Sequence, residues 1–153
     1  LQRTNQFNLS GHSYDHAAFK KLLDNSDCKN FCVSVNDKFG NYGIVLFASI
    51  RSIGNNLVLE DLVMSCRVAQ KMVETTFIYW LASYAKKMNK SLLQINLSIS
   101  YKNKPLQQCL ESIDLISSSR QMMDKKILLV DLSQEIEVPQ IIAITSKSVE
   151  VKY

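Results

Sequence analysis

Two cations lie close together in the segment DLVMSCRVAQKMVETTFIYWL (residues 61–81), where an apolar strand gives way to a long amphipathic helix. We expect Ser65 to be the N-cap of this helix, which would place Arg67 and Lys71 in its first turns. A helix dipole already puts partial positive charge at the N-terminus, so both cations oppose the field unless they bind an anion. The segment therefore predicts an anion-binding site; the alternative is that both side chains point into solvent.

Three other side chains of this region could take part in catalysis. Glu60 and Asp61 lie on opposite faces of the expected strand, and either carboxylate could be a general base. Cys66 could be a nucleophile, because a helix N-terminus lowers the pKa of a nearby thiol. Each group also has a structural interpretation, since strand carboxylates are usually solvated and free cysteines are usually small buried side chains.

The elements that position these groups follow from hydrophobic periodicity. A first helix is expected from an N-cap at Ser13 to about Asn25, followed by three antiparallel strands near residues 31–35, 44–50 and 57–64. The long helix comes next, and its apolar stripe consists of Val73, Phe77, Trp80, Leu81, Tyr84 and Met88.

A fourth strand is expected at residues 92–99, parallel to the third because a helix crosses between them. A short helix follows at residues 103–112, a late strand at 126–132 and a further strand at 139–145. The sequence thus predicts an α/β (α+β) protein whose mixed sheet has an antiparallel meander followed by a parallel strand pair, flanked by helices. We expect the parallel pair to splay apart where Ser65 begins the long helix.

The composition is that of an ordinary globular domain. The chain has 153 residues, 46% apolar residues and a net charge of +4, and no apolar run approaches the ~20 residues that cross a bilayer. Its basic residues are not interleaved with aromatic ones, so we expect neither a nucleic-acid nor a membrane partner. The spacing of the four cysteines and two histidines does not favour a metal site, and we expect reduced thiols in a cytoplasmic protein.

Three motifs resemble one known family. RTNQFNLS (residues 3–10), SCRVAQKMVE (65–74) and NKP (103–105) are similar to segments of the C-terminal domain of FkbH-like proteins. In that family a HAD-type phosphatase-like domain precedes a domain with the GNAT N-acetyltransferase fold, and the family is associated with loading a glyceryl unit onto an acyl carrier protein. The resemblance implies that residues 1–12 connect to an upstream domain and that residues 13–153 form a GNAT-like domain. The missing initiator methionine also leads us to expect a piece of a longer or processed polypeptide.

The resemblance also implies roles for individual residues. In this fold the turn after the meander holds the pyrophosphate of coenzyme A, or here the phosphate of a phosphopantetheine thioester, at a helix N-terminus. The residues implied for cofactor binding are Met64, Arg67, Val68, Ala69, Gln70, Lys71, Met72 and Asn103. The residues implied for an acyl or carrier-arm pocket are Arg3, Asn5, Gln6 and Asn8, which could instead be linker residues that cap turns. No metal is expected in this domain.

The turn departs from the family's pattern, which is Arg or Gln, two residues, Gly, one residue, and Gly or Ala. Gln70 occupies the glycine position and Met72 lies near the second small position; all four glycines of the chain precede Asn55. Glycine lets a backbone approach phosphates closely, so the steric half of the site is lost. Arg67 and Lys71 could still hold phosphate by charge.

Three functions remain open from the sequence. The chain could be the acyltransferase domain of an FkbH-like protein that hands a glyceryl-type acyl group to an acyl carrier protein or a small acceptor. It could be a catalytically degenerate GNAT-like domain that binds a carrier protein or supports a HAD-like neighbour. It could also be a free-standing coenzyme A-dependent N-acetyltransferase, which the glycine-free turn disfavours.

Overall fold

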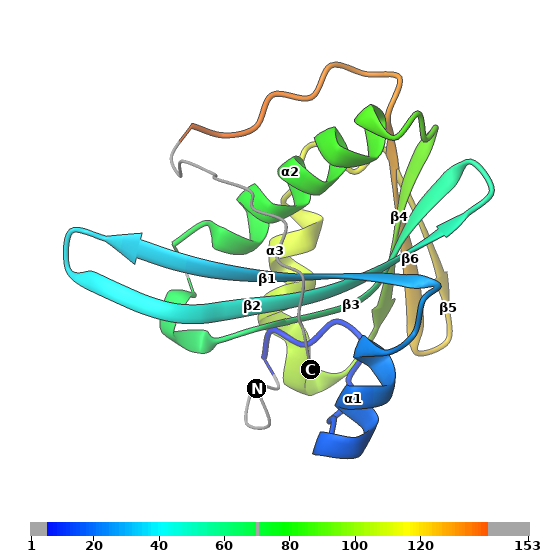
Figure 1. The fold of residues 1–153 in the computed structure, drawn as a ribbon. Coiled ribbons are helices and arrows are strands. Elements are labelled where there is room, and N and C mark those ends of the chain that lie inside the picture. The colour runs from blue at the N-terminus through cyan, green and yellow to red at the C-terminus, as the bar shows by residue number, and fades with distance from the viewer. Residues whose placement is uncertain (1–5, 70, 141–153) are drawn as a thin grey trace.

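The computed structural model describes residues 6–69 and 71–140, and its central feature is a six-stranded mixed sheet in the order β1-β2-β3-β4-β6-β5 (Figure 1). The strands are β1 (Cys28–Asp37), β2 (Gly40–Ile53), β3 (Asn56–Met64), β4 (Leu92–Ser98), β5 (Ser118–Met122) and β6 (Lys125–Asp131). The helices are α1 (His16–Leu23), α2 (Val73–Lys87) and α3 (Lys104–Glu111), with 3-10 turns at Cys66–Val68 and Tyr101–Asn103. The predicted class, meander and parallel strand pair are confirmed; β5 is a strand that the sequence interpretation missed.

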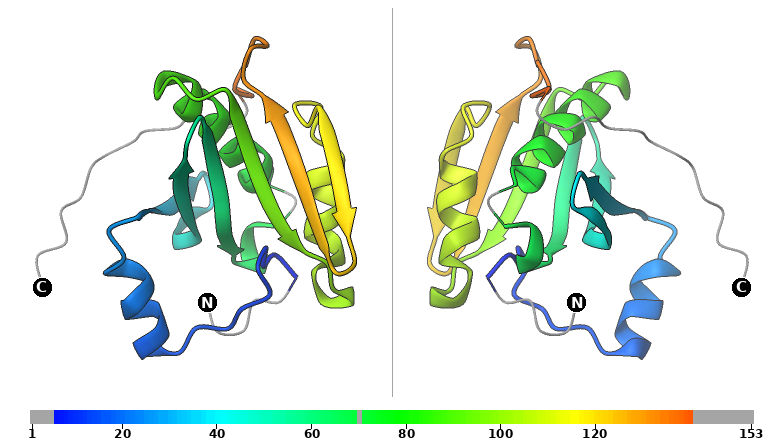
Figure 2. Two further views of the ribbon diagram at one scale, coloured as in Figure 1. Left: turned by 90° about the vertical axis from the view of Figure 1, so that its right-hand side faces the viewer. Right: turned by 90° about the vertical axis from the view of Figure 1, so that its left-hand side faces the viewer.

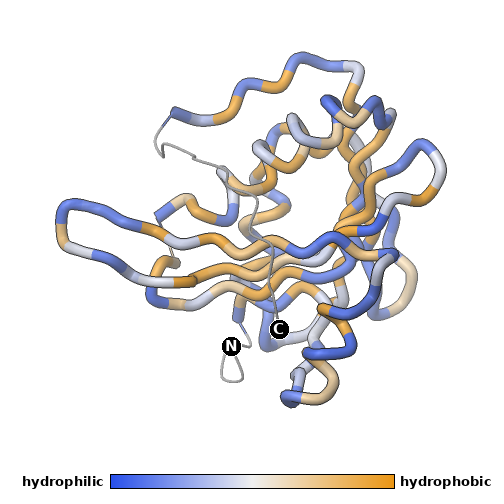
Figure 3. The backbone as a smooth tube through the Cα atoms, viewed as in Figure 1, coloured by the Kyte–Doolittle hydropathy of each residue, from blue (hydrophilic) through white to orange (hydrophobic). Residues whose placement is uncertain are grey.

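Helices lie on both faces of this sheet (Figure 2). α2 and α3 cover one face, where Leu59, Leu62 and other buried apolar residues form the core. α1 covers part of the other face, and its Phe19 ring packs edge-on against Phe47 of β2 with 5.0 Å between the centroids. Apolar residues are concentrated along the strands and on α2 (Figure 3). In the predicted stripe Val73, Phe77 and Leu81 are buried and Trp80 and Tyr84 are partly buried, whereas Met88 follows the end of α2 and is exposed. No helix in the described part of the chain is long and apolar enough to cross a membrane.

A β-bulge in β3 sets the directions of its two acidic side chains. Ser49 of β2 pairs with Asp61 and Ile50 pairs with Leu59, so Glu60 is an extra residue without a partner on β2. A bulge of this kind bends the strand and redirects the side chains around it. Asp61 is consequently buried on the face that α1 covers, whereas Glu60 is partly exposed.

The two parallel strands are paired for only a short distance. Pairing runs from Asn56 opposite Leu92 to Leu59 opposite Ile95, and beyond these residues β3 and β4 diverge. The predicted splay at the end of β3 is confirmed.

Residues 6–10, called the N-terminal segment below, fill the opening between the diverging strands β3 and β4 (Figure 2). The Phe7 carbonyl accepts a hydrogen bond from the Met64 N–H at 2.9 Å, and the Leu9 N–H donates to the Leu62 carbonyl at 2.8 Å. On the other side, the Leu9 carbonyl accepts from the Ser98 N–H of β4 at 2.9 Å. Because Phe7 and Leu9 are also buried, this segment acts as a short extra strand and belongs to the core.

Several element boundaries differ from the sequence prediction. α1 begins after an Asp15 N-cap, whose carboxylate accepts a backbone N–H, and not after Ser13. Ser65 caps a 3-10 turn, and α2 starts only at Val73, because the backbone between them turns through a left-handed residue. The strand predicted at 139–145 falls mostly outside the described residues, and its first two residues are not in a strand.

Candidate functional site

The turn between β3 and α2 is anchored by the core on one side. Met64 and Val68 are fully buried and Ala69 packs partly against the core, so these side chains do not face a ligand. On the outer side, the Ser65 hydroxyl accepts hydrogen bonds from the Arg67 N–H at 3.4 Å and from the Arg67 Nε at 3.2 Å. Arg67 is exposed, so its guanidinium is open to an anion.

Lys71, in contrast, already has an anionic partner within the chain. Its Nζ lies 2.8 Å from Oδ2 of Asp37, at the end of β1, and 5.0 Å from the centroid of the Tyr42 ring. The hydrogen bond from Lys71 lowers the pKa of Asp37, and the hydrogen bond to Asp37 raises the pKa of Lys71. The anion that the sequence pattern predicts at Lys71 is therefore supplied by β1, and a phosphate would have to compete with it.

Met72 has a backbone conformation that favours glycine. Its φ of 60° and ψ of 18° lie in the left-handed region directly before α2 begins, and it makes no side-chain cap. The family resemblance places a small residue near this position. Met72 therefore differs from the family's pattern in its side chain, whereas its backbone keeps the left-handed conformation that glycine adopts most easily. Gln70, the other departing position, lies outside the described residues.

A buried carboxylate lies in the first turn of α2. Glu74 accepts a weak hydrogen bond from the Cys109 thiol of α3, with 3.6 Å between Sγ and Oε1, and its Oε2 has no partner among the described residues. Burial raises the pKa of Cys109 to about 11, so this sulfur stays protonated at neutral pH. The Glu74 carboxylate suits the helix dipole, and it repels a further anion in the turn.

Cys66 and Glu60 are both accessible. The Cys66 thiol is exposed and lies 3.7 Å from Oε1 of Gln6, so the interpretation of Cys66 as a buried core thiol is wrong. Glu60 Oε1 lies 3.8 Å from Nε of Arg51 in a partly exposed ion pair. Ion pairs of this kind contribute little to stability, and this one gives Glu60 an ordinary surface role.

Asp61 is a buried carboxylate with a nearby donor, the Tyr14 hydroxyl, although neither carboxylate oxygen makes a hydrogen bond of full geometry in the described part of the chain. It is 2% exposed, and opposite it on β2 the fully buried Ser49 hydroxyl has no hydrogen-bond partner among the described residues. Tyr14 approaches from the segment before α1. Burial, and then a hydrogen bond to the Asp61 carboxylate and the charge of that carboxylate, raise the pKa of the Tyr14 hydroxyl. Burying an incompletely paired ionisable group is costly, and such groups are concentrated at functional sites.

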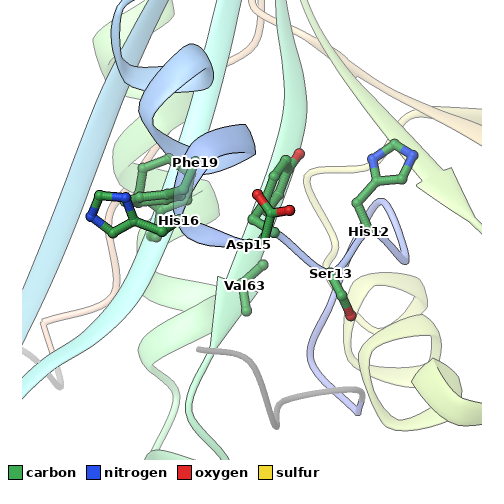
Figure 4. A pocket seen from close by; sticks show the side chains of 8 residues that line it. His12, Ser13, Asp15, His16, Phe19 and Val63 are labelled. Atoms are coloured by element: carbon green, nitrogen blue, oxygen red, sulfur yellow. The ribbon is translucent and has the colours of Figure 1, made fainter.

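A cavity of about 250 Å³ lies on the same face of the sheet, under α1 (Figure 4). It is lined by residues 12–16 together with Phe19, Phe47 and Val63. Val63 follows Asp61 by two positions along β3, and Tyr14 belongs to both the lining and the Asp61 cluster. The walls are largely aromatic, with two imidazoles at the rim, and Asp61 is not part of the lining; Tyr14 is the residue that connects the cavity with the carboxylate.

Two asparagines hold the N-terminal segment in place. The Asn103 Nδ2 donates to the backbone carbonyls of Asn8 at 2.9 Å and Ser98 at 2.7 Å. The Asn8 Nδ2 donates to the His12 carbonyl at 2.9 Å, and its Oδ1 accepts from the Gly11 N–H at 2.8 Å. Both amides are buried, and contact with a ligand would require breaking these bonds.

The predicted site residues thus fall into two groups around the end of β3. Arg67 and the exposed Gln6 lie on the side of the turn, and Asp61 lies by the cavity on the α1 face. Arg3 and Asn5 lie outside the described residues. Sequence reasoning missed Tyr14, Ser49 and Asp37 as neighbours of these groups, because strand pairing and chain crossing bring them there and no local pattern marks them. Among the described residues, no cluster of three or more His, Cys, Asp or Glu side chains could hold a metal ion.

The fold is similar to that of several solved structures. The ribosomal-protein-S18-alanine N-acetyltransferase from Escherichia coli matches with a TM-score of 0.59 at 13% identity, with 81% of each chain covered. A domain from Methanocaldococcus jannaschii matches with a TM-score of 0.62 at 8% identity, covering 78% of this chain and 77% of that one. A structure assigned to the GNAT family, from Desulfovibrio desulfuricans, matches with a TM-score of 0.57 at 10% identity and 76% coverage of each chain. No protein-family model and no curated protein sequence matches the chain. At these identities the likeness establishes the fold alone: the chain has a GNAT-like fold.

Proposed function

We propose that this chain is an acyltransferase domain in which a pantetheine thioester and a small acceptor meet at Asp61. The observation that carries the proposal is the buried Asp61 carboxylate, which the Tyr14 hydroxyl approaches and which lies on the face that holds the cavity. The GNAT-like fold supports acyl transfer as the class of reaction. The resemblance to FkbH-like proteins supports the finer assignment, which is a glyceryl-type acyl group and an acyl carrier protein.

The proposed step is a proton-coupled transfer. Asp61 takes the proton of the acceptor's amine or hydroxyl as that group attacks the thioester carbonyl carbon. The carbon–sulfur bond then breaks, and the departing thiolate takes up a proton. To load a carrier protein, the free thiol of the arm would instead attack the carbonyl carbon of an acyl phosphate while Asp61 takes the thiol proton, the carbon–oxygen bond would break, and phosphate would leave. Tyr14, which is protonated at neutral pH, is placed to donate a hydrogen bond to Asp61 in the same cluster.

The arm belongs at the opening between β3 and β4, near the turn that follows β3. The N-terminal segment already occupies backbone groups of both strands there, so the arm's amides would bind beyond it, next to Ser65. Arg67 is the exposed cation for a phosphate, whereas Lys71 would first have to leave Asp37. The site therefore fits coenzyme A or phosphopantetheine by charge and only in part by shape. We expect acetyl-coenzyme A to bind with a dissociation constant on the order of 0.1 mM or weaker.

The test compares two adjacent carboxylates. Thiol release from acyl-coenzyme A and acyl-carrier thioesters is measured with a panel of small amines and alcohols. Asp61→Asn should lower the rate by about 100-fold or more, the usual scale for loss of a general base. Glu60→Gln, its partly exposed neighbour on the same strand, is the matched control and should change the rate by less than about twofold. Equal rates for the wild type and Asp61→Asn would refute the role of Asp61.

A second candidate is a catalytically degenerate GNAT-like domain that binds a carrier protein or supports a HAD-like neighbour. The pairing of Lys71 with Asp37 and the Met72 side chain in the turn favour it, because both weaken a phosphate site. It predicts carrier binding with no turnover of any thioester in the panel. The third candidate, a free-standing coenzyme A-dependent N-acetyltransferase, requires low-micromolar binding of acetyl-coenzyme A in a calorimetric titration. A HAD-type coding sequence directly upstream in the gene would support the FkbH-like assignment.

A further inference from the structure

The turn between β5 and β6 exposes two methionines where a hairpin normally has polar residues. Met123 is 94% exposed and has a φ of 53°, and Met122 beside it is also exposed. Short hairpin turns with positive φ prefer asparagine, aspartate or glycine, which adopt this conformation at low cost. Met123 thus combines an unfavourable backbone conformation with an apolar side chain in water. Neither property stabilises the fold.

A third exposed apolar side chain lies beside this turn. The β4–β6 pairing places Ser98 opposite Lys125, and the Ile99 N–H donates to the Asp124 carbonyl at 2.6 Å. These bonds fix the hairpin next to the chain that leaves β4, where Tyr101 is 86% exposed. Figure 2 shows the β5–β6 turn at the same end of the molecule as the start of α3. We call Tyr101, Met122 and Met123 the Met–Tyr patch.

The surroundings of the Met–Tyr patch are basic. The exposed cations on the same segments are Lys102, Lys104, Arg120 and Lys125, and none of them belongs to an ion pair among the described residues. The Lys102 Nζ lies 5.8 Å from the centroid of the Tyr101 ring. Asp124 contributes the acidic side chain of the turn itself. A surface of adaptable apolar side chains ringed by cations is complementary to an acidic protein surface with apolar residues at its centre.

We propose that the Met–Tyr patch is the docking surface for a small acidic carrier protein that presents its phosphopantetheine arm to the opening between β3 and β4. The identity of this partner rests on the proposed acyl transfer, whereas the patch itself does not. Tyr101 is two residues from Asn103, whose amide holds the N-terminal segment in that opening, so a protein docked here lies beside the arm's route. A second copy of this chain is a poor occupant, because the chain has a net charge of +4 and its cations would face one another.

The test measures binding of a purified acyl carrier protein, in its apo and its phosphopantetheinylated form, at low salt. Met122→Thr combined with Met123→Asn should weaken binding of both forms by about tenfold or more, the scale of losing an interface hot spot. Asparagine suits a left-handed turn, so this variant should melt at or above the wild-type temperature. Phe39→Ser is the control, since Phe39 is a 77% exposed aromatic residue beside Lys38 in the β1–β2 turn. It should leave binding unchanged.

The outcomes separate docking from catalysis. Wild-type affinity in the double variant, or an equal loss of affinity in Phe39→Ser, would refute the proposal that the Met–Tyr patch is the docking surface. So would binding of the phosphopantetheinylated form alone, because the arm rather than the protein would then be recognised. Patch-dependent binding to vesicles with 30 mol% phosphatidylserine, or patch-dependent self-association, in place of carrier binding would assign the surface to a membrane or to a second copy. Patch-dependent carrier binding without any thioester turnover would keep the docking surface and refute the proposed acyl transfer.

Discussion

Replacing Met72 with glycine isolates the strain stored in the turn before α2. Met72 has a φ of 60°, and the left-handed conformation costs a non-glycine residue about 1–2 kcal/mol. Met88 is the matched control, because it flanks the other end of the same helix with an ordinary φ of −85°. The exposed fractions of the two residues, 37% and 42%, are nearly equal. The loss of side-chain contacts and the greater freedom of an unfolded glycine should therefore be similar in both variants.

The two variants should move stability in opposite directions. Met88→Gly should lose about 0.5–1 kcal/mol through unfolded-state entropy. Met72→Gly should lose the same amount and regain about 1–2 kcal/mol of strain, which leaves a net gain near 0.5–1 kcal/mol. For a chain of this size the difference between the variants corresponds to about 2–8 °C in melting temperature. Differential scanning calorimetry measures it directly. If the two variants melt within about 1 °C of each other, Met72 carries no backbone strain and the glycine-like geometry of the turn is wrong.

Four further outcomes test other parts of the molecule. Leu9→Ala should destabilise by about 2–5 kcal/mol in urea unfolding, because Leu9 is fully buried between the diverging strands; a change below about 0.5 kcal/mol would show that the N-terminal segment is a loose linker. Asp37→Asn should release Lys71 and tighten binding of inorganic pyrophosphate, followed by calorimetry, whereas unchanged binding would mean that Lys71 cannot reach the turn. Tyr14 has a folded-state pKa above its unfolded value near 10, so the stability it supports is complete below about pH 10 and is lost at higher pH. The wild type should accordingly lose more melting temperature than Tyr14→Phe between pH 8 and pH 10.5, and parallel losses would remove Tyr14 from the buried cluster. Asp61→Asn should leave the melting temperature unchanged or higher, because it removes a buried charge for which the structure gives no hydrogen bond of full geometry; a marked fall would show that its contact with Tyr14 stabilises the fold.

The order of the elements around the site follows from the sequence. The alternation near 31–35, the apolar runs near 44–50 and 57–64 and the stripe on the long helix are local patterns, and they agree with β1, β2, β3 and α2. The missed strand β5 has the sequence SSRQM and is exposed along its whole length. The sequence of β5 therefore has no alternation of buried and exposed residues from which a strand could be predicted. Pairing with β6 holds β5 in the sheet.

The sequence also identified the residues at the end of β3 whose side chains could take part in binding or catalysis. It could not determine what those side chains contact. Arg67 and Lys71 look equivalent in one dimension. In the folded chain the end of β1 lies beside the turn, and this brings the Asp37 carboxylate to Lys71. The two residues are 34 positions apart in the sequence, so no local pattern predicts their ion pair. Likewise, Glu60 and Asp61 are adjacent carboxylates, and a single bulge in β3 sends one to the surface and buries the other.

The N-terminal segment also differs between the sequence prediction and the structure. Its polar side chains predict a ligand pocket when only neighbours in the sequence are considered. Yet Asn8 binds the chain's own backbone, and Phe7 and Leu9 complete the core between two strands that begin about 50 and 80 residues later. Local periodicity determined which segments become strands and helices. The tertiary structure decided which polar groups are satisfied within the fold and which, like Asp61, remain to act, because hydrogen-bond satisfaction depends on neighbours that only folding brings together.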